Sequence, residues 1–574
     1  MAKYTADFET TTDLEDCRVW AYAICEIGHP ENFIYGNNIE DFMKWCENSD
    51  NAELYFHNLK FDGEFIFYYL LTNGYECVKN KKDKKSKSFT CLISDMGQFY
   101  SIEVYFEIKG HHTKKVTFYD SMKILNMSVD KIAKGFNLPI RKLEIDYTEK
   151  REIGHILTKQ EIDYIRNDVE IMSRALYIMF NENLTKMTIG SNAINFFKEN
   201  FEGFNDFFPK LDYQVYHDIK DSYKGGFTYL NPIYKEKIIG EGIVLDVNSL
   251  YPSVMKNEKL PYGYGVFFPD KYEPNSLYDL YIQCITCSFE IKDGKIPTIQ
   301  LKNSLHFMPN EYIASSGGDI VCLTLTNIDL ELFLKHYNVY DLEYHGGFMY
   351  QSMRGIFNYY VDYWFQKKDN AKKEHNDALY LISKLMLNSC YGKFGSSMDI
   401  SNKYPYLNDE GVVKYHLEQS EKSEGIYLPM ACFITAYARK KTITSSQKIK
   451  DFTKSKYGID MYIYSDTDSI HTTLTNVEEL KNIIDIDEYR LGAWKIETNF
   501  RKAKFLRQKC YIEDTWNDKN QEWELKTTVA GLPKNLGNKI NFHNFNKNFT
   551  TEGKLAFKHV KGGIVLVDTS FSIK

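Results

Sequence analysis

Between residue 1 and about residue 185, apolar positions form short strand-like runs that alternate with longer helical stretches. This alternation is typical of an α/β domain. One helix has a marked start, because Thr158 and Glu161 form a capping-box pattern ahead of the run EIDYIRNDVEIMSRALYIMF. We therefore predict an α/β unit over residues 1–187.

The pattern changes after this unit. A linking segment, 188–260, contains the apolar strand GIVLDV. The segments that follow are a strand-rich insertion at 261–355, a helical stretch at 356–394, a polar loop-rich insertion at 395–426, mixed strands and helices at 427–530, and a tail with strand-like runs at 531–574. A chain of 574 residues is too long for one core, so several domains are expected.

Two local patterns have simple interpretations. The Lys-rich stretch 79–87, KNKKDKKSK, is predicted to be a solvated hairpin tip rather than a nucleic-acid contact. Cys284 and Cys287 lie in the alternating run YIQCITCSFEI with no second pair nearby. This favours a strand over a zinc site.

Composition adds weak constraints. Aromatic residues make up 15% of the chain, which suits base stacking but better suits an aromatic core. A net charge of −7 counts mildly against nucleic-acid binding, unless carboxylates are concentrated as ligands of cations. The 11 scattered cysteines, the absence of an apolar leader and the absence of a long apolar run predict a reducing cytoplasm and no membrane span.

A first set of acids lies in the N-terminal unit. Asp7 and Glu9 are two apart at the end of a predicted strand, so both side chains point to one face. Asp62 follows in HNLKFDG, and Asp168 lies one helical turn after Tyr164. Any one of these acids alone is more simply a cap or a solvated charge. Together, four such carboxylates can hold two Mg²⁺ or Mn²⁺ ions about 3.5–4 Å apart.

A second set lies in the C-terminal half. Asp246 ends the strand GIVLDV, and Asp466 and Asp468 lie at the turn of a predicted hairpin. Carboxylates of this kind anchor the cations of phosphoryl transfer. Between them, three residues fall on one stripe of a predicted helix: Lys384, Asn388 and Tyr391. Taken alone, this stripe is equally well a solvated helix face with Tyr391 in the core.

The motifs resemble those of a known family. DFET, HNLKFDG and the Tyr164–Asp168 pair resemble the Exo I, II and III motifs of proofreading nucleases, and DVNSLYP, KLMLNSCYG and YSDTDS resemble motifs A, B and C of family B DNA polymerases. Tyr223–Gly226 resembles the YxGG motif, Thr435–Arg439 the TxxAR motif and Lys509–Tyr511 the KxY motif of the protein-primed phi-29 type of Bacillus phages. The resemblance runs essentially from end to end.

This resemblance implies a multidomain α/β and α+β fold, with an RNase H-like exonuclease domain and a right-hand polymerase domain. The implied domains are a 3′–5′ exonuclease domain at 1–187, palm at 188–260 and 427–530, terminal-protein regions at 261–355 and 395–426, fingers at 356–394 and thumb at 531–574. The second terminal-protein region would close a collar around the template.

It also implies a replicative DNA-directed DNA polymerase with 3′–5′ proofreading that is protein-primed, processive and strand-displacing. Two Mg²⁺ or Mn²⁺ ions would serve each site. The implied partners are template and primer DNA, dNTPs, a terminal priming protein and a phage single-stranded-DNA-binding protein. The chain would act as a monomer in the cytoplasm of a bacterial host.

Residue roles follow from the resemblance, position by position. Asp7, Glu9, Asp62 and Asp168 would bind exonuclease metals, with Tyr164 orienting the attacking water and Lys142 stabilising the phosphate. The residues expected to hold the single-stranded primer end are Thr10, His57, Asn58, Phe61 and Ser121. Asp246, Val247 and Asp468 would bind polymerase metals, with Asp466 as a third acid. The residues expected to receive the dNTP are Val247, Tyr251 as steric gate, Lys384, Asn388 and Tyr391. The remaining DNA contacts are expected at Tyr223, Gly225, Gly226, Thr435, Arg439, Lys509 and Tyr511.

One position departs from the phi-29 type, which has a lysine where this chain has Tyr380. Lys372 or Lys373 is a candidate to supply the missing charge. Three other kinds of protein would fit part of this pattern. They are a stand-alone nuclease, a non-enzymatic replication scaffold, and a glycosyltransferase built on Asp466 and Asp468. The first two leave one or both acid sets without a task, and the third leaves the N-terminal set unexplained.

Overall fold

The N-terminal unit is built on one mixed sheet. The computed structural model describes residues 2–49, 51–147, 149–302, 306–308, 311–419 and 422–573. The first sheet has the strand order β3–β2–β1–β4–β8–β7–β6–β5. Its strands are β1 (Lys3–Thr10), β2 (Val19–Glu26), β3 (His29–Gly36), β4 (Glu53–Phe56), β5 (Glu76–Cys77), β6 (Ser88–Ile93), β7 (Phe99–Lys109) and β8 (His112–Asp120).

Helices cover both faces of this sheet. They are α1 (Ile39–Asn48), α2 (Leu59–Thr72), α3 (Val129–Gly135) and α4 (Lys159–Asn181). The alternation of β1 sends Ala6 and Phe8 into the core shared with α1 and α2, whereas Thr5 donates a hydrogen bond to Val169 O of α4 at 2.7 Å. The predicted capping box of Thr158 and Glu161 is present at the start of α4 and is confirmed.

The Lys-rich stretch 79–87 is not a hairpin tip. β5 and β6 pair in parallel, so the segment between them crosses over instead of turning back. Its residues include a short 3₁₀ turn at Lys81–Asp83, and Lys81 forms an ion pair with Glu103 at 2.5 Å. The sequence prediction was wrong because alternation alone does not give the relative direction of two short strands.

A second sheet forms the centre of the C-terminal half. Its order is β22–β21–β20–β11–β19–β18–β9, with β10 beside β20. The strands are β9 (Thr228–Leu230), β10 (Ile238–Ile239), β11 (Gly242–Val247), β18 (Tyr462–Asp466), β19 (Ser469–Thr472), β20 (Trp494–Arg507), β21 (Cys510–Asn517) and β22 (Glu522–Val529). The long helix α12 (Leu428–Tyr457) packs against it, and its hydroxyls bond to the β18–β19 hairpin through Thr442 and Ser446.

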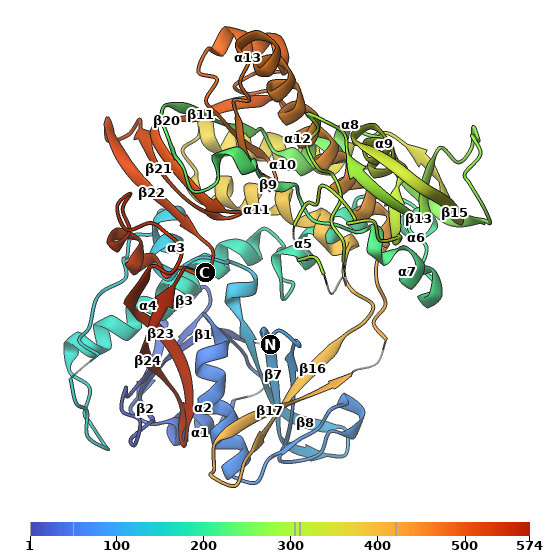
Figure 1. The fold of residues 1–574 in the computed structure, drawn as a ribbon. Coiled ribbons are helices and arrows are strands. Elements are labelled where there is room, and N and C mark those ends of the chain that lie inside the picture. The colour runs from blue at the N-terminus through green and yellow to red at the C-terminus, as the bar shows by residue number, and fades with distance from the viewer. Residues whose placement is uncertain are drawn as a thin grey trace.

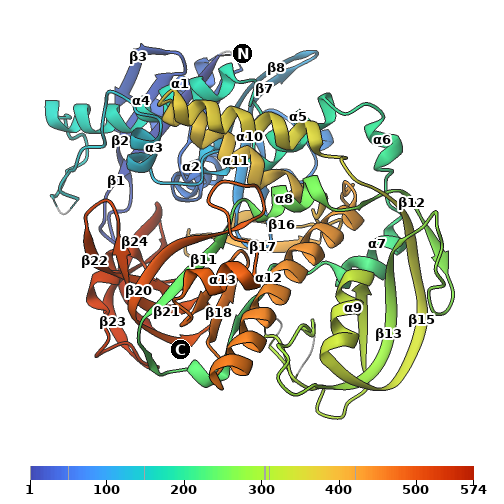
Figure 2. The same cartoon turned by 90° about the horizontal axis from the view of Figure 1, so that it is seen from above.

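The C-terminal half contains further helices (Figure 2). They are α5 (Ile189–Glu199), α6 (Phe204–Phe207), α7 (Tyr213–Ile219), α8 (Leu250–Asn257), α9 (Asn327–His336), α10 (Asn358–Lys373), α11 (Asp377–Phe394) and α13 (Val477–Ile483). The pair α10 and α11 is joined by a short turn and is therefore antiparallel, and Tyr360 OH donates to Met386 O between them. The helical segment predicted at 356–394 is confirmed.

The insertion at 261–355 is strand-rich, as predicted. It forms a sheet of order β12–β15–β13–β14, from β12 (Leu260–Phe268), β13 (Leu280–Ile291), β14 (Val321–Thr326) and β15 (Tyr337–Met353). Cys284 and Cys287 lie on β13, which confirms the predicted strand.

The prediction of a loop-rich insertion at 395–426 missed two strands. The insertion forms a hairpin of β16 (Ser401–Leu407) and β17 (Val413–Gln419). Only one side of the hairpin is buried, so most of its residues are polar. Val413, Leu407 and Tyr415 pack against the core of the N-terminal unit. A sequence with so few apolar positions is predicted to be loop unless the surface that it packs against is known.

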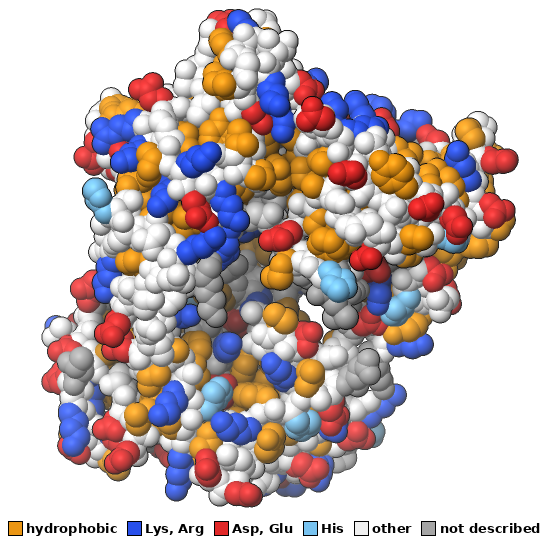
Figure 3. Space-filling view, in the orientation of Figure 1, with side chains coloured by type: hydrophobic (Ala, Val, Ile, Leu, Met, Phe, Trp, Pro, Cys, Tyr) orange, Lys and Arg blue, Asp and Glu red, His pale blue; other side chains and the backbone are white. Residues whose placement is uncertain are grey.

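A second hairpin from the C-terminal half reaches the same region. β23 (Thr550–Val560) and β24 (Gly563–Ser572) lie beside α2, across from β16 and β17 (Figure 1). Gly562 and Gly563 have positive φ, and a Cβ on Gly562 would lie 1.9 Å from Cys17 O, so glycine is needed for this close approach. The two halves meet at these two hairpins and in a shared core that joins α3 and α4 to α5 and α11. A hollow bordered on one side by Lys and Arg lies between the halves (Figure 3).

Among the described helices, the structure contains none that is both long and apolar enough to span a bilayer.

Candidate metal centres

The first acid set is assembled as the sequence predicted. One oxygen from each of Asp7, Glu9 and Asp168 lies within 4.8 Å of the others. Asp7 and Glu9 come from β1, and Asp168 comes from α4, one turn after Tyr164. Asp62 at the start of α2 adjoins this triad, because its Oδ1 accepts a hydrogen bond from Phe8 N at 3.3 Å. Asp62 is thus a fourth carboxylate beside the triad, close enough for the charges of Asp7 and Glu9 to raise its pKa after burial has done so.

These carboxylates are poorly compensated. Burial, reinforced by the charge of Asp168, raises the pKa of Asp7 to about 7, and burial with Asp7 and Asp168 raises the pKa of Glu9 well above its usual value. Asp62 is raised by burial and by Asp7. Asp168 Oδ1 is buried with no hydrogen-bond partner among the described residues. Like charges held together in this way fit a divalent cation, which would favour their ionised forms.

Three side chains border the triad. Lys142 forms an ion pair with Asp168 and lies 5.5 Å from the Tyr164 ring. Tyr164 is buried, and its hydroxyl is 2.5 Å from that of Tyr147. Tyr147 was missed by the sequence reasoning. It lies in an irregular segment, where no periodicity predicts which side chains turn inward.

The residues predicted to hold a primer end lie at neighbouring strand ends. His57 Nδ1 is 3.0 Å from Ser121 Oγ, and Asn58, which has a positive φ, donates from its backbone N to Asp120 Oδ1 at 3.1 Å. Phe61 N donates to Asn58 O at 2.9 Å, and the Phe61 ring lies 6.2 Å from that of Phe557 of β23 between centroids. Thr10 is at the end of β1, opposite Val19.

The second centre lies where β11 meets the β18–β19 hairpin. Val247 N donates to Asp468 O at 2.8 Å, and Asp246 pairs with Ser469 on one side and Lys495 on the other. Burial raises the pKa of Asp246 to about 6, with further contributions from Asp468 and Glu497. Burial also raises the pKa of Asp468, and the charges of Asp466 and Glu497 add to this shift.

Asp466 is turned towards other partners. It accepts hydrogen bonds from Thr228 Oγ1 at 3.1 Å and forms an ion pair with Lys509 at 3.5 Å. Asp246 and Asp468 are therefore the better pair for a shared cation, and Asp466 links them to Lys509. Glu497 was not predicted. It is the extra residue of a β-bulge in β20, between the partners of Val244 and Leu245.

The predicted helical stripe lies on α11. Lys384 and Asn388 are exposed, and the ring of Tyr391 stacks on that of Tyr251 at 4.0 Å between centroids. Lys368 of α10 is a further cation at this place: burial lowers its pKa, and the neighbouring charges of Lys384 and Lys495 lower it further. Lys373 instead forms an ion pair with Asp369 at 2.7 Å. Lys368 is thus a cation that shares the space beside Lys384, and of the two predicted candidates Lys372 is among its charged neighbours.

Arg439 lies beneath the 223–226 segment. It is 1% exposed, donates to Lys224 O at 2.7 Å and Gly225 O at 2.9 Å, and forms an ion pair with Asp329 at 2.6 Å. Thr435 is also buried, and its hydroxyl donates to Ala431 O within α12. Both residues therefore contact protein, and Arg439 fixes the backbone of the segment that contains the two glycines.

A cleft of about 760 Å³ joins several predicted positions. Gly225 and Gly226 line one side, Thr467 of the acidic turn another, and Lys509 a third. Tyr223 lies at one end of this segment, and Gly395 approaches its ring so closely that a Cβ there would be 2.6 Å away. Tyr511 is buried in a ring cluster with Tyr464, whose hydroxyl accepts a hydrogen bond from Lys509 N at 3.0 Å.

Comparison with known proteins agrees with this arrangement. Residues 44–487 match the family model of DNA polymerase type B, organellar and viral. The chain is 44% identical over its whole length to the DNA polymerase of Bacillus phage M2, and 41% identical to that of Bacillus phage phi29, covering 99% of each. The fold is similar to that of phi29 DNA polymerase in a ternary complex with primer-template DNA and incoming nucleotide, with a TM-score of 0.93, 41% identity and full coverage of both chains.

With both acid centres in place, a family model covering most of the chain and full-length similarity above 40%, the chain belongs to the type B DNA polymerases of organelles and viruses, among the phi29-type enzymes of Bacillus phages.

Proposed function

We propose that this DNA-directed DNA polymerase also removes nucleotides from 3′ ends at a second, separate active site. The observation that carries the proposal is the pair of carboxylate clusters on different sheets, each with pKa values raised by burial and like charge. Family membership accounts for the C-terminal cluster. The N-terminal cluster needs a task of its own, since clustered buried carboxylates are costly to keep without one.

Divalent cations, Mg²⁺ or Mn²⁺, fit both clusters, with two ions in each site. Asp7, Glu9, Asp62 and Asp168 would hold them in the exonuclease, and Asp246, Asp468 and the adjacent Val247 in the polymerase. When bound, such ions activate the attacking oxygen and stabilise charge on the leaving oxygen. The orphaned Asp168 Oδ1 and the raised pKa values support this assignment.

In the polymerase site, the fingers supply the positive charge. Lys384 and Lys368 would bind the triphosphate of the incoming dNTP. Lys368 would thus supply the positive charge that the phi29 type has in a lysine at the position of Tyr380. Tyr251 lies against Tyr391, so its ring is held in place to exclude a ribose 2′-hydroxyl. Asn388 and Tyr391 would contact the nucleotide. Gly225 and Gly226 would approach the template, and Lys509 and Tyr511 the primer strand, with Tyr223, Thr435 and Arg439 supporting that surface.

In the exonuclease site, Tyr164 and Lys142 would act on the phosphodiester. The Tyr164 hydroxyl would orient the attacking water, and Lys142 would stabilise the phosphate charge. Tyr147 touches Tyr164 and would share this task. Thr10, His57, Asn58, Phe61 and Ser121 would hold the single-stranded end. A related structure, phi29 DNA polymerase complexed with single-stranded DNA, supports a site of this kind.

The contacts of two hairpins support processive and strand-displacing synthesis, and the family resemblance adds protein priming through the insertions at 261–355 and 395–426. The hairpin of β16 and β17 and that of β23 and β24 both reach the N-terminal unit, and Val412 bridges to Lys561 between them. A ring closed in this way would enclose DNA and separate strands ahead of the site. The partners would be a terminal priming protein, template and primer, dNTPs and a phage single-stranded-DNA-binding protein. The enzyme would work as a monomer in the host cytoplasm.

One experiment separates the two activities. Asp468→Ala should abolish nucleotide incorporation on a primed template and leave degradation of single-stranded 3′ ends intact. The double variant Asp7→Ala with Glu9→Ala should do the reverse. Because each variant keeps one activity, that activity reports correct folding. Loss of both activities in a folded Asp468→Ala protein would contradict two independent centres.

A further inference from the structure

Lys142 and Tyr147 are not held in place by regular structure. They belong to the segment between α3 and α4, whose described residues 136–147 and 149–158 form no helix or strand. The Lys142 side chain is 35% exposed and Tyr147 is 50% exposed, so burial does not fix them either. Asn167 Nδ2 of α4 donates to Arg141 O beside Lys142 at 2.9 Å, so a further contact is needed for the part of the segment around Tyr147.

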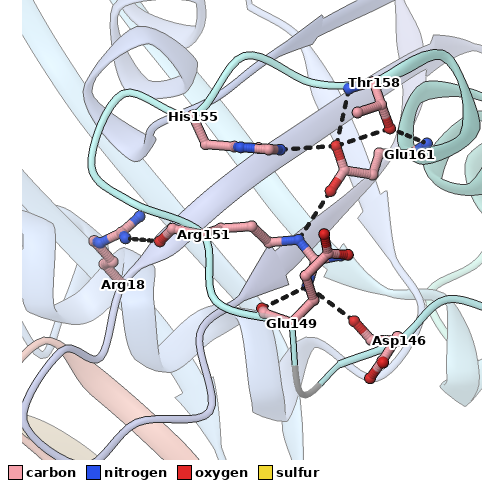
Figure 4. Close-up of polar contacts among 7 residues, drawn as sticks. All are labelled: Arg18, Asp146, Glu149, Arg151, His155, Thr158 and Glu161. Atoms are coloured by element: carbon pink, nitrogen blue, oxygen red, sulfur yellow. Dashed lines mark hydrogen bonds and ion pairs between the residues drawn. The ribbon is translucent and has the colours of Figure 1, made fainter.

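Arg151 makes that contact (Figure 4). It is 4% exposed, and its Nη1 donates to Asp146 O and to Glu149 O, both at 2.9 Å. These carbonyls lie on either side of Tyr147. Its Nε donates to Glu161 Oε1 at 2.9 Å, and its guanidinium lies 4.3 Å from the ring centre of Trp20 in β2. One buried side chain thus grips the backbone around Tyr147 and joins it to α4 and the sheet.

Glu161 is a rigid anchor for this grip. It belongs to the capping box of α4 and accepts a hydrogen bond from His155 Nε2 at 2.8 Å. Burial alone would raise its pKa, but hydrogen bonds from His155, Thr158 and Arg151 lower the pKa of Glu161 to about 2. Glu161 is therefore ionised at neutral pH, and the ion pair with Arg151 is buried on both sides.

We propose that Arg151 is a positioning residue of the exonuclease. It clamps the turn that carries Tyr147 to the first turn of α4. The same helix carries Tyr164 and Asp168. The clamp therefore sets the distance between Tyr147 and the Tyr164 hydroxyl that it touches. This inference rests on the proposed exonuclease activity.

A purely electrostatic role for Arg151 is the alternative. Burial, Asp7 and Asp168 raise the pKa of Glu9, and the positive charges of Lys142 and Arg151 act against that shift. Arg151→Lys separates the two roles. It keeps the charge, but a lysine ammonium lacks the planar fork that bonds both carbonyls and Glu161 together.

The experiment compares Arg151→Ala, Arg151→Lys and the neighbouring control Lys150→Ala in the full-length protein with Mg²⁺. Lys150 is exposed and pairs only with exposed Glu152 among the described residues. Degradation of a single-stranded 3′ end gives kcat and KM, and single-nucleotide incorporation gives the polymerase rate. Hydrogen exchange of the amides in 141–147 reports the position of the segment without relying on either activity.

Both Arg151 variants should lower exonuclease kcat by about 10- to 100-fold, the effect of a misplacement of roughly 1 Å. KM, the polymerase rate and the Lys150→Ala variant should stay near wild type, and amide exchange in 141–147 should accelerate. Exonuclease kcat within twofold of wild type in Arg151→Ala, or full recovery in Arg151→Lys, would overturn the clamp.

Two further outcomes are separable. If Arg151→Ala does not fold, as judged by loss of polymerase activity, Glu161→Gln is measured in its place and the same kcat and exchange criteria decide. If wild-type protein does not degrade 3′ ends, the exonuclease proposal fails, whereas the exchange comparison still accepts or rejects the clamp.

Discussion

The N-terminal cluster of Asp7, Glu9 and Asp168 should destabilise this protein when no divalent cation is present, and Asp7→Asn should relieve that effect. Burial and the charge of Asp168 raise the pKa of Asp7 from 3.8 to about 7. Asparagine keeps the shape of the side chain and removes the charge. The variant should therefore lose exonuclease activity and, in metal-free buffer, become more stable than wild type.

The sign and size follow from proton linkage. Because the pKa of Asp7 is higher in the folded state, the folded state binds the proton more tightly than the unfolded state. The free energy of unfolding therefore falls as pH rises from about 4, and the fall is complete above about 7. A shift of about three pH units is worth at most about 4 kcal/mol. Since Asp7 is only half-buried and Lys142 is close, we expect about 1–3 kcal/mol.

Thermal unfolding at pH 8 in EDTA measures this difference. A gain of about 1–3 kcal/mol corresponds to a rise in Tm of roughly 2–10 °C for a domain of this size. At pH 5 the rise should shrink, because wild-type Asp7 is then largely protonated. Mg²⁺ at pH 8 should raise the Tm of wild type more than that of the variant. Asp163→Asn, at an exposed position of α4, is the matched control.

The reasoning would be refuted if Asp7→Asn were no more stable than wild type at pH 8 in EDTA. It would also fail if the gain were the same at pH 5, or if Asp163→Asn gave an equal gain.

Three further predictions concern the polymerase. Tyr251→Val should increase ribonucleotide use relative to deoxynucleotide use by roughly tens-fold, since removal of a steric contact is worth a few kcal/mol. An unchanged ratio of the two in single-nucleotide kinetics would contradict the steric-gate role of Tyr251. Lys368→Ala should raise the KM for dNTP by about tenfold or more, the value of one charge-assisted contact to a phosphate. Lys373→Ala loses only an exposed ion pair with Asp369 and should leave this KM unchanged. Equal KM values for the two variants would exclude Lys368 from the triphosphate site. Replacement of 397–424 by a short Gly/Ser linker should leave extension on single-stranded template nearly normal. Extension should stall at duplex and give shorter products, because Val413 and its hairpin no longer meet the N-terminal core. Equal progress through duplex by both proteins on one gel would contradict the proposal that this hairpin closes a collar around the template.

The parts of the two centres that follow local geometry could be predicted from the sequence. Asp7 and Glu9 share a face because side chains alternate along a strand, and Asp168 follows Tyr164 by one helical turn. Asp466 and Asp468 lie at a hairpin turn, as their flanking strands require. In each case the needed information lies within a few residues of the acid.

The residues that were missed depend on long-range contacts. Glu497 reaches the polymerase acids because β20 contains a bulge opposite β11, and alternation does not predict where a bulge falls. Lys368 meets Lys384 through the packing of α10 on α11. Tyr147 is held by Arg151 through two carbonyl contacts in a segment without periodicity. The hairpin at 401–419 was read as loop for the same reason, since its buried face is defined by another domain.

Net charge was the most misleading feature of the composition, and the structure explains why. The two centres hold eight acids: Asp7, Glu9, Asp62, Asp168, Asp246, Asp466, Asp468 and Glu497. Of the 78 acidic residues, 70 then remain against 71 basic ones, so the chain outside the centres is close to neutral. Divalent cations bound at the centres would offset the remaining negative charge. With those cations bound, a polyanionic substrate would meet local fields of favourable sign at both centres and at the lysines of α10 and α11, although the chain as a whole is acidic.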